Sequence, residues 1–319
     1  MATNPTFKFE DAERVKLKAS IMIEGLTGSG KSGLALLLGF YLAGGDWTKV
    51  FDIDTENKSA NLFAGIPFSN GNSVGKFKVG QLTEDIGFKP SNYLMFRTAA
   101  KNAGAEVVIE DSISHAWQYQ GGVLDIVNEV ANKSPKSDKY GAWRDEKVSK
   151  EKNNLLTLLR DPDCHVITTV RVKEKFEYVE EEGKNKLKSL GEQQIQQADL
   201  KYEPDLVLHM VHAGSPTIAP RAEIIKSRYS ILTVGDEYDF TPELCIQLKA
   251  YLEDGADPEE LKEQQRQEYI QAISDHLDSH KNKVTIWNVI KEDAGFKDDK
   301  LKDIPLEAIK KLYMQLTTD

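Results

Sequence analysis

A glycine-rich segment of eight residues is the part of the sequence best suited to chemistry. Residues 25–32, GLTGSGKS, fit the pattern G-x-x-x-x-G-K-[S/T] and lie between the apolar run IMI and the helix-forming run SGLALLLGF. Glycines let the backbone aim N–H groups at phosphate oxygens, and the N-terminus of the following helix adds partial positive charge. A glycine-rich turn without a ligand is the alternative, which the flanking runs disfavour. The segment therefore predicts a site for ATP.

Two side chains of this segment have individual expected roles. Lys31 should bridge the β- and γ-phosphates, and Ser32 should ligate Mg²⁺. The backbone of the whole loop should line the phosphates. The predicted nucleotide-binding residues are Gly25, Leu26, Thr27, Gly28, Ser29, Gly30, Lys31, Ser32 and Gly33.

Acidic residues end two other apolar runs. VVIEDS supplies Glu110 and Asp111, and we expect Asp111, which precedes a serine, to hold Mg²⁺, with Glu110 as the alternative. FDIDTEN offers Asp52, Asp54 and Glu56, of which Glu56 is the predicted general base for the attacking water. Capping a helix or forming a turn is the other role such carboxylates can have.

Apolar runs must form the elements that position these residues. They alternate with helical periodicity up to about residue 235, which is typical of parallel strands joined by helical crossovers and covered on both faces. The predicted strands are 20–25, 49–54, 106–111, 165–170, 205–211 and 222–229, and the predicted helices are 31–43, 91–102, 122–131 and 146–160. The expected fold class is α/β, a P-loop NTPase core with a mostly parallel central sheet flanked by helices.

The composition changes after residue 254. Residues 255–319 are charged and helix-forming, and both DPEELKEQQRQEYIQAISDHL and IPLEAIKKLYMQL have the pattern of amphipathic helices. We therefore predict an ATPase domain over 1–254, with 1–17 as a lead-in, and a small all-α C-terminal domain over 255–319.

Charge and cysteine usage limit the partners and the compartment. The net charge of -10 excludes a global basic footprint, so any contact with nucleic acid must be local. Two cysteines and the polar start MATNPTFKFEDAER favour a reducing cytoplasm. The apolar run LALLLGFYLAG is shorter than the roughly 20 residues that span a bilayer, so no membrane partner is expected. His115 is expected to be structural, because no cysteine or histidine cluster indicates zinc.

Taken in order, the motifs resemble the phage nucleotide-binding ATPases of the RecA-like class, which include single-strand annealing recombinases of the Sak type. The resemblance extends from about residue 18 to 230. It is carried by KASIMIEGLTGSGKSGLALLL, DIDTENKSANLF, EDSISHAWQYQGGVLD, YGAWRDEKVSKEKNNLL, HVITTVRVKEKFEY and YEPDLVLHM. It implies a RecA-type core sheet, ATP hydrolysis, and Glu56 in the role of the catalytic glutamate.

The resemblance also implies two further sets of catalytic residues. HVITTVR should end in a γ-phosphate sensor, where RecA has glutamine and this chain has Thr168, Thr169 and Arg171; Thr169 is our choice, with an ordinary strand former as the alternative. In IIKSRY, Lys226 and Arg228 would share one face of a strand. They match a basic pair that reaches the neighbouring subunit's γ-phosphate in a ring or filament, although an exposed basic strand edge is equally compatible.

In RecA-like folds two loops face DNA, and their counterparts here are ANKSPKSDKYGAWR and residues 174–200. The first interleaves basic residues with Tyr140 and Trp143, as sequence-tolerant binding of single strands uses. The second carries three lysines and a run of glutamines, although residues 180–182, all glutamate, nearly cancel its positive charge. The candidates for DNA contact are Lys133, Lys136, Lys139, Tyr140, Arg144, Lys184, Lys186 and Lys188. Trp143 in the core and the lysines on a solvated face are the alternatives.

Together these features predict a Mg²⁺-dependent ATPase that acts on single-stranded DNA in phage recombination, annealing or replication, in the host cytoplasm. A single-strand DNA-binding protein is a further expected partner, and a homo-oligomer is the expected assembly. An ATP-switched loader or assembly factor that acts on a protein without binding DNA is the first alternative, which the acidic charge favours. A small-molecule kinase is the second alternative, and the lack of an Arg-rich lid segment in the sequence argues against it.

Overall fold

The chain forms two compact units, each with its own core. The computed structural model describes residues 11–67, 73–133, 139–181, 184–196, 199–215, 218–280 and 283–318. The larger unit is Leu17–Leu252, and the smaller one combines the described N-terminal residues up to Lys16 with the chain from Glu253 onward.

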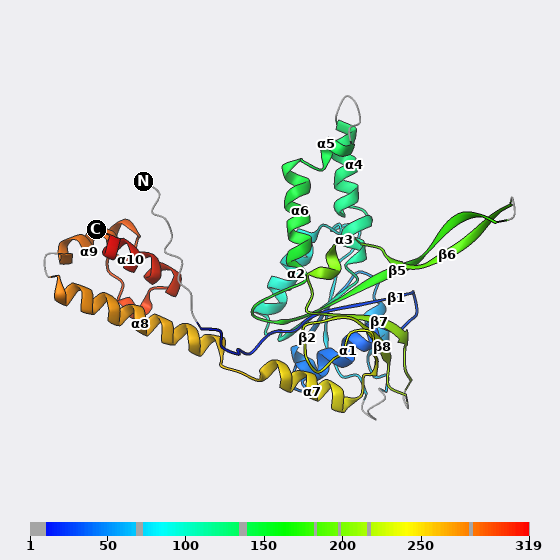
Figure 1. Ribbon diagram of the computed structural model, residues 1–319, viewed down its shortest axis with the longest axis horizontal. Helices are drawn as coiled ribbons and strands as arrows, with labels where there is room; N and C mark the ends of the chain where they lie inside the picture. The colour runs from blue at the N-terminus through cyan, green and yellow to red at the C-terminus, as the bar shows by residue number, and fades with distance from the viewer. Residues whose placement is uncertain are drawn as a thin grey trace. The chain divides into compact units, whose positions relative to one another are not determined.

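A single twisted sheet forms the centre of the larger unit (Figure 1). Among the described residues its strands follow the order β3-β2-β4-β5-β1-β7-β8-β9, with β6 paired to β5 outside this row. The strands from β3 to β7 in that row run parallel, whereas β8 and β9 are antiparallel to their neighbours. The bounds are β1 Ser20–Gly25, β2 Val50–Asp54, β3 Lys78–Gln81, β4 Val107–Asp111, β5 His165–Glu181, β6 Lys184–Gln194, β7 Leu206–His212, β8 Arg221–Ser227 and β9 Glu237–Asp239. The predicted α/β class with a mostly parallel sheet is confirmed.

Helices cover both faces of this sheet. Apolar side chains of α1 and α7 pack on one face, and those of α2, α3 and α6 pack on the other. The helices α4 and α5 join α6 in a small separate cluster. Their bounds are α1 Lys31–Leu42, α2 Pro90–Asn102, α3 Ser114–Gln118, α4 Val123–Lys133, α5 Lys139–Ala142, α6 Glu146–Thr157 and α7 Pro242–Glu253, with short 3₁₀ turns at Trp47–Lys49, Ser59–Phe63 and Leu200–Tyr202.

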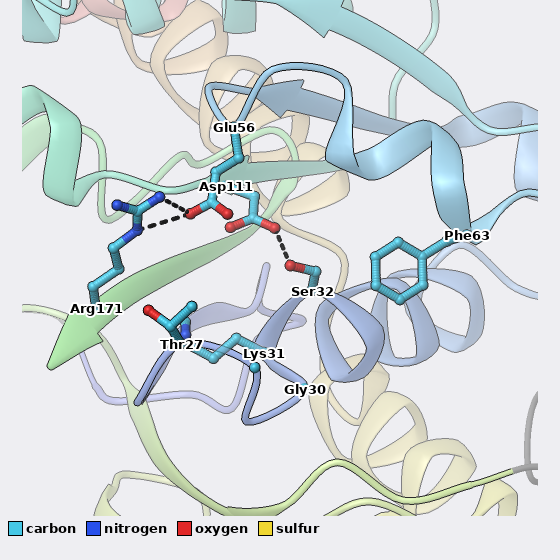
Figure 2. A pocket seen from close by; sticks show the side chains of 9 residues that line it. Thr27, Gly30, Lys31, Ser32, Glu56, Phe63, Asp111 and Arg171 are labelled. Atoms are coloured by element: carbon cyan, nitrogen blue, oxygen red, sulfur yellow. Dashed lines mark hydrogen bonds and ion pairs between the residues drawn. The ribbon is translucent and has the colours of Figure 1, made fainter.

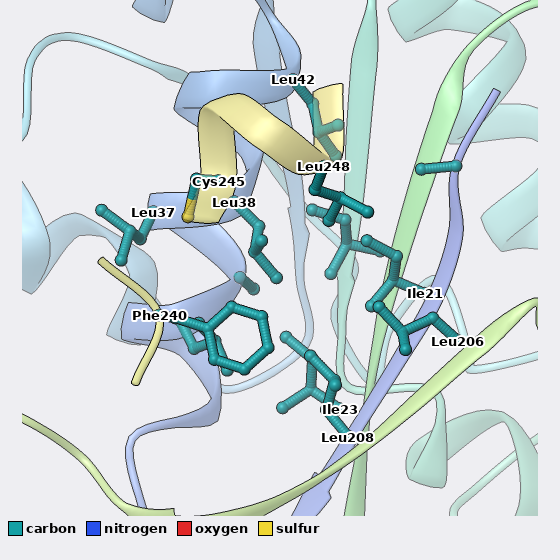
Figure 3. Close-up of a cluster of buried hydrophobic side chains, with 14 of the residues drawn as sticks. Ile21, Ile23, Leu37, Leu38, Leu42, Leu206, Leu208, Phe240, Cys245 and Leu248 are labelled. Carbon is teal, nitrogen blue, oxygen red and sulfur yellow. The ribbon is translucent and has the colours of Figure 1, made fainter. Parts of the chain in front are cut away.

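Two-sided burial explains why the strands are continuous apolar runs. Ile21 and Ile23 of β1 face α1 and α7, while Met22 between them faces the opposite layer. Figure 3 shows the first of these layers, in which the side chains of β1 and β7 meet those of α1 and α7. Burying one such aliphatic side chain contributes about 1.5–3 kcal/mol. This packing holds the parallel strands in place, so that their carboxyl ends lie together on one side of the sheet.

The described elements match most of the predicted ones. All six predicted strands are present, and the four predicted helices correspond to α1, α2, α4 and α6. The main difference concerns residues 174–200, for which a loop was expected: β5 instead continues to Glu181 and pairs with β6 as an antiparallel hairpin. Its register places Glu177 opposite Lys188 and Glu181 opposite Lys184.

The smaller unit is helical. Its elements are α8 Pro258–Ser279, α9 Val284–Asp293, a 3₁₀ turn Leu301–Asp303 and α10 Leu306–Thr318. They pack around Ile273, Trp287 and Ile309. The N-terminal segment, expected with the ATPase domain, associates here, because the Lys16 N–H donates to the Ala256 carbonyl at 2.9 Å. In the described residues of both units, every helix is too short or too polar to cross a bilayer.

Candidate nucleotide site

The predicted phosphate-binding loop connects β1 to α1. Gly28 and Gly30 have φ angles of 80° and 93°, in the left-handed region that favours glycine. A Cβ added at Gly30 would lie 2.5 Å from Ala213, so packing also excludes a side chain there. The loop therefore depends on glycine both for its turn and for its close approach to Ala213, the residue that follows β7.

A cavity of about 210 Å³ opens beside this loop (Figure 2). It lies at the carboxyl ends of β1, β2 and β4 and beside Arg171 of β5, and ligands of open α/β sheets bind outside such carboxyl ends. The lining residues are Thr27, Gly28, Gly30, Lys31, Ser32, Glu56, Phe63, Asp111 and Arg171. The remaining predicted loop residues, Gly25, Leu26, Ser29 and Gly33, lie in the loop or at the start of α1 without lining the cavity.

Lys31 is buried within the loop, with 8% of its surface exposed. Its ammonium donates to the carbonyl oxygens of Gly25 and Leu26 at 3.0 and 2.9 Å. A buried lysine requires such partners. These bonds hold the charge at the wall of the cavity, where a triphosphate would meet it.

Asp111 and Ser32 meet at the floor of the cavity. The Ser32 hydroxyl donates to Asp111 Oδ2, and the Thr169 hydroxyl donates to Oδ1 at 2.5 Å. Burial raises the pKa of Asp111, while these two hydrogen bonds act against that rise. A hydroxyl and a carboxylate are hard oxygen ligands of the kind that Mg²⁺ takes together with water and phosphate oxygens. The described residues hold no cluster of three or more acidic, histidine or cysteine side chains suited to a metal.

Glu110, the alternative metal ligand, faces away from the cavity. Successive side chains of a strand point to opposite faces. Glu110 is fully buried against α2, where it accepts from Arg97 Nε at 3.0 Å. Burial raises its pKa, and the guanidinium of Arg97 opposes the rise. The geometry thus favours Asp111 for the metal.

The segment after β2 brings Glu56 into the cavity, whereas Asp52 and Asp54 of β2 do not line it. Asp54 Oδ1 accepts the backbone N–H of Glu56 at 2.6 Å, and Oδ2 accepts from Gln81 at 3.0 Å, so Asp54 shapes the turn that carries Glu56. Asp52 is 2% exposed, and burial raises its pKa well above the usual range, with Asp111, Asp54 and Glu56 adding to the effect.

Arg171, rather than Thr169, reaches the cavity from β5. Its guanidinium donates to Glu56 Oε1 through Nε at 2.9 Å and a terminal nitrogen at 2.6 Å (Figure 2). Thr169 is fully buried beneath the cavity against Asp111, and Thr168 donates to the Ile21 carbonyl at 3.4 Å. The predicted sensor role of Thr169 does not fit this geometry, because the parallel pairing of β5 with β1 continues two residues further, to Arg171, and it is Arg171 that lines the cavity.

A buried polar network supports the two acidic strand ends. The Thr55 hydroxyl lies 2.7 Å from His115 Nδ1 and accepts the Ser112 N–H at 2.8 Å. Burial lowers the pKa of His115 to about 4, and nearby Arg171 acts in the same direction, so the imidazole is neutral at physiological pH. His115 is therefore a structural link between the segments that follow β2 and β4.

Phe63 is a cavity residue that the sequence analysis missed. It ends the 3₁₀ turn Ser59–Phe63, and a Cβ added at Gly33 would lie 3.6 Å from its ring. An aromatic ring at this position can stack on a nucleotide base. The only signal in the sequence is an apolar aromatic residue in the polar segment TENKSANLF.

Lys226 and Arg228 lie far from the cavity of their own chain. Because β8 runs antiparallel to β7, Lys226 pairs with Val207 near the start of β7, at the opposite end of the sheet. Its ammonium donates to the carbonyls of Tyr202 and Pro204, and Arg228 donates to Asp205 at 2.9 Å. β8 ends at Ser227, so Arg228 lies just beyond the strand on which both residues were expected. Their role across a subunit boundary stays a prediction.

The candidates for DNA contact fall into two groups. Lys133 at the end of α4, Tyr140 in α5 and Arg144 are exposed, with 90% of Tyr140 accessible. Trp143 is half-buried, and its ring lies 6.2 Å from that of Trp117. The residues whose side chains lie outside the described part of the structure are Lys136, Lys139, Lys184, Lys186 and Lys188.

Comparison with known proteins agrees with this geometry. A family model described as an AAA domain matches residues 17–235, which include the parallel strands and every residue that lines the cavity. The chain belongs to this family of P-loop ATPases. No curated protein matches the chain.

Proposed function

We propose that this protein is a Mg²⁺-dependent ATP hydrolase whose nucleotide state controls its grip on single-stranded DNA. The observation that carries the proposal is the cavity itself, in which a phosphate-binding loop, a hydroxyl–carboxylate pair and a further glutamate converge from separate strand ends. These are the parts that phosphoryl transfer to water needs.

Each part has a defined task in hydrolysis. The loop amides and Lys31 hold the phosphates, and the ring of Phe63 stacks on the base. Ser32 and Asp111 would hold Mg²⁺, directly and through water, and the ion would neutralise charge on the phosphate oxygens. Glu56 orients the attacking water and accepts its proton.

The DNA part of the proposal rests on how the cavity connects to the rest of the larger unit. β5 leaves the cavity at Arg171 and continues directly into the hairpin with β6 (Figure 1). At the base of the hairpin the Ile195 N–H donates to the Arg171 carbonyl at 2.8 Å, and Gln194 donates to Glu24 of β1. The hairpin is therefore continuous with the cavity wall at Arg171, and it corresponds to a segment that faces DNA in the RecA-like ATPases that the sequence resembles.

The tip of the α4–α6 region supplies a second contact surface. Tyr140 of α5 offers an exposed aromatic platform, and Lys133 at the end of α4 and Arg144 after α5 offer exposed positive charge. Stacking with local charge suits sequence-tolerant binding of single strands by a protein whose net charge is -10.

ATP hydrolysis by the wild type and Lys31→Ala, with and without single-stranded DNA, tests the proposal together with DNA binding at two salt concentrations. We expect hydrolysis that DNA stimulates and that the variant lacks, and binding that salt weakens. Tyr140→Ala/Arg144→Ala should weaken binding, whereas the control Lys201→Ala/Tyr202→Ala, which removes an exposed cation and ring elsewhere, should not. Hydrolysis indifferent to DNA, with no binding at low salt, would contradict the DNA part.

The role of Lys226 and Arg228 in a neighbouring subunit's site is open to a mixing experiment. Lys226→Ala/Arg228→Ala keeps its own cavity, and Lys31→Ala keeps the basic pair. If the pair acts in trans, a mixture of the two inactive variants regains part of the hydrolysis. If the mixture hydrolyses ATP no faster than the sum of its two separate components, the pair has no such role.

An ATP-switched factor that acts on a protein partner is the second candidate. It is favoured by the acidic net charge and by the exposed apolar residues Val284, Ile286 and Val289 on α9, between 38% and 53% accessible. Hydrolysis without any DNA response, together with capture of a protein partner that Lys31→Ala fails to release, would favour this function over the first.

A further inference from the structure

The turn that follows β2 carries Glu56 into the cavity, and its backbone has a conformation that needs support. Asn57 and Lys58 have φ angles of 55° and 69°, in the left-handed region that favours glycine. This region is disfavoured for residues with a side chain, and two in succession persist only where other contacts hold them. Because both residues directly follow Glu56, the contacts that hold them also fix the backbone of Glu56.

Asp54 holds both ends of this turn. Its Oδ1 accepts the Glu56 N–H at 2.6 Å, and its Oδ2 accepts the Ala60 N–H at 3.3 Å. Asp54 is the last residue of β2 and is 1% exposed, so the pairing of β2 with β3 and β4 sets its position. One carboxylate therefore bonds to the backbone before and after the two left-handed residues.

A second side chain reaches the turn from β3. Gln81 is the last residue of that strand and lies opposite Asp54 in the register. Its Nε2 donates to Asp54 Oδ2 at 3.0 Å, and its Oε1 accepts the Lys58 N–H at 3.1 Å. A glutamine amide has both a donor and an acceptor. It can therefore join a carboxylate, which only accepts, to a backbone N–H, which only donates.

The bonds of Gln81 matter more for the direction of Glu56 than for the fold. Without Gln81, Asp54 would keep its bonds to the N–H groups of Glu56 and Ala60, so the turn would still form. The Lys58 N–H would lose its acceptor, and the two left-handed residues could relax toward ordinary conformations. A general base acts only within hydrogen-bond reach of the water, so a small displacement of Glu56 would cost rate.

We propose that Gln81 is a positioning residue for hydrolysis, which joins Asp54 to the Lys58 N–H and so fixes the backbone that presents Glu56 to the attacking water. The inference rests on the proposed hydrolase function. Gln81 is not among the residues that line the cavity, so it acts through Glu56 and not on the nucleotide. The phosphate-binding loop lies on other elements, and its grip on ATP does not depend on Gln81.

Removing the bridge should slow hydrolysis without weakening nucleotide binding. Gln81→Met keeps the length of the side chain but makes neither hydrogen bond, so its single-turnover rate should fall at least about tenfold. Its affinity for a non-hydrolysable ATP analogue with Mg²⁺ should stay within about twofold of wild type. Gln247→Met, at an exposed glutamine of α7, is the matched control and should change neither value. Thermal unfolding without nucleotide should show that both variants are folded.

Two double variants separate positioning from a general loss of structure. If Gln81 acts through Glu56, adding Gln81→Met to Glu56→Gln should lower the residual rate by less than about twofold. Gln81→Glu places a second carboxylate against Asp54 and should slow hydrolysis at least as much as Gln81→Met. Asp54→Asn then restores a donor opposite that carboxylate, so Asp54→Asn/Gln81→Glu should be at least about threefold faster than Gln81→Glu.

The outcomes separate failure of this inference from failure of the proposed function. If the wild type hydrolyses ATP and Gln81→Met does so at the same rate, the positioning role is refuted. The same holds if the losses of Gln81→Met and Glu56→Gln multiply in the double variant, or if Asp54→Asn fails to raise the rate of Gln81→Glu. If Gln81→Met does not fold, the comparison of Gln81→Glu with the double variant decides alone. If the wild type neither binds nor hydrolyses ATP, the proposed function itself fails.

Discussion

Two arginine–glutamate pairs of the larger unit share their chemistry but differ in position: one is buried between α2 and β4, and the other lines the cavity at the carboxyl ends of the strands. Arg97 and Glu110 are 3% and 0% exposed, and the Arg97 guanidinium also donates to the carbonyl oxygens of Thr157 and Arg160, both at 3.1 Å. Arg171 and Glu56 are 24% and 28% exposed in the wall of a cavity. The first pair joins α2, β4 and the end of α6, whereas the second joins two segments at the site of the proposed reaction.

Burial decides what each pair can do. Removing one partner of a buried pair leaves an uncompensated charge in a low dielectric, so such a pair is fixed once the chain has folded. A partly exposed pair contributes little to stability and can exchange one partner for a ligand. Glu110 and Asp111 are neighbours in sequence, yet strand alternation gives one a structural partner and the other the proposed metal.

Removing the carboxylate charge from each pair should produce opposite phenotypes. Glu56→Gln is expected to lower the rate of ATP hydrolysis by about 10²–10⁴-fold, the usual contribution of a general base, with little change in stability. Glu110→Gln should instead destabilise the fold and leave the rate per folded molecule near that of wild type. Single-turnover hydrolysis and urea unfolding of both variants measure this contrast, and equal rate losses would contradict it.

The two arginines should also differ in how much they contribute to the free energy of unfolding, with the buried one contributing more. Arg97→Ala is expected to cost about 3–5 kcal/mol of unfolding free energy, because Glu110 is left buried without its partner. Arg171→Ala, with a partly exposed partner, should cost less than about 1 kcal/mol. Urea unfolding without nucleotide measures both, and a large loss of stability in Arg171→Ala would mean that this pair is structural too.

The threonine behind Asp111 should affect the metal more than the fold. Thr169→Val removes the hydrogen bond to Oδ1 with almost no change in side-chain volume. Outer partners of metal ligands contribute about 10–100-fold to affinity, so the Mg²⁺ concentration that half-saturates hydrolysis should rise by about tenfold. Thr168→Val, one residue away on the other face, is the matched control and should leave it unchanged.

Asp52 offers a smaller test, as a buried carboxylate without a basic partner among the described residues. Its raised pKa means that the folded chain keeps a proton that the unfolded chain releases above its pKa of about 3.9. The stability from this group is therefore lost as pH rises from that value through the folded pKa. Asp52→Asn should raise the unfolding free energy by about 1 kcal/mol at pH 8 and by less at pH 5, as measured by urea unfolding at the two pH values. A larger gain at pH 5 would contradict this sign.

Local patterns predicted the helices and strands well. A strand covered on both faces gives a continuous apolar run in the sequence, and a turn that depends on glycine gives glycines at fixed positions. They also indicated Asp111 over Glu110 as the metal ligand, because Asp111 is the carboxylate that directly precedes a serine. They could not indicate the contact between Arg171 and Glu56, because the two residues are 115 positions apart in sequence. The contact depends on the order of the strands in the folded sheet, in which only β4 lies between β2 and β5. The hairpin was missed because a segment rich in charged residues has the composition of a solvated loop, and its antiparallel pairing depends on residues that are separated in sequence.

The central claim is that the cavity hydrolyses ATP with Glu56 as the base. Its most direct test is single-turnover hydrolysis of ATP with Mg²⁺ by the wild type and Glu56→Gln, with nucleotide binding measured on the same samples. We predict that both proteins bind ATP and that only the wild type converts it to ADP and phosphate at an appreciable rate. Equal rates in the two proteins would contradict the claim.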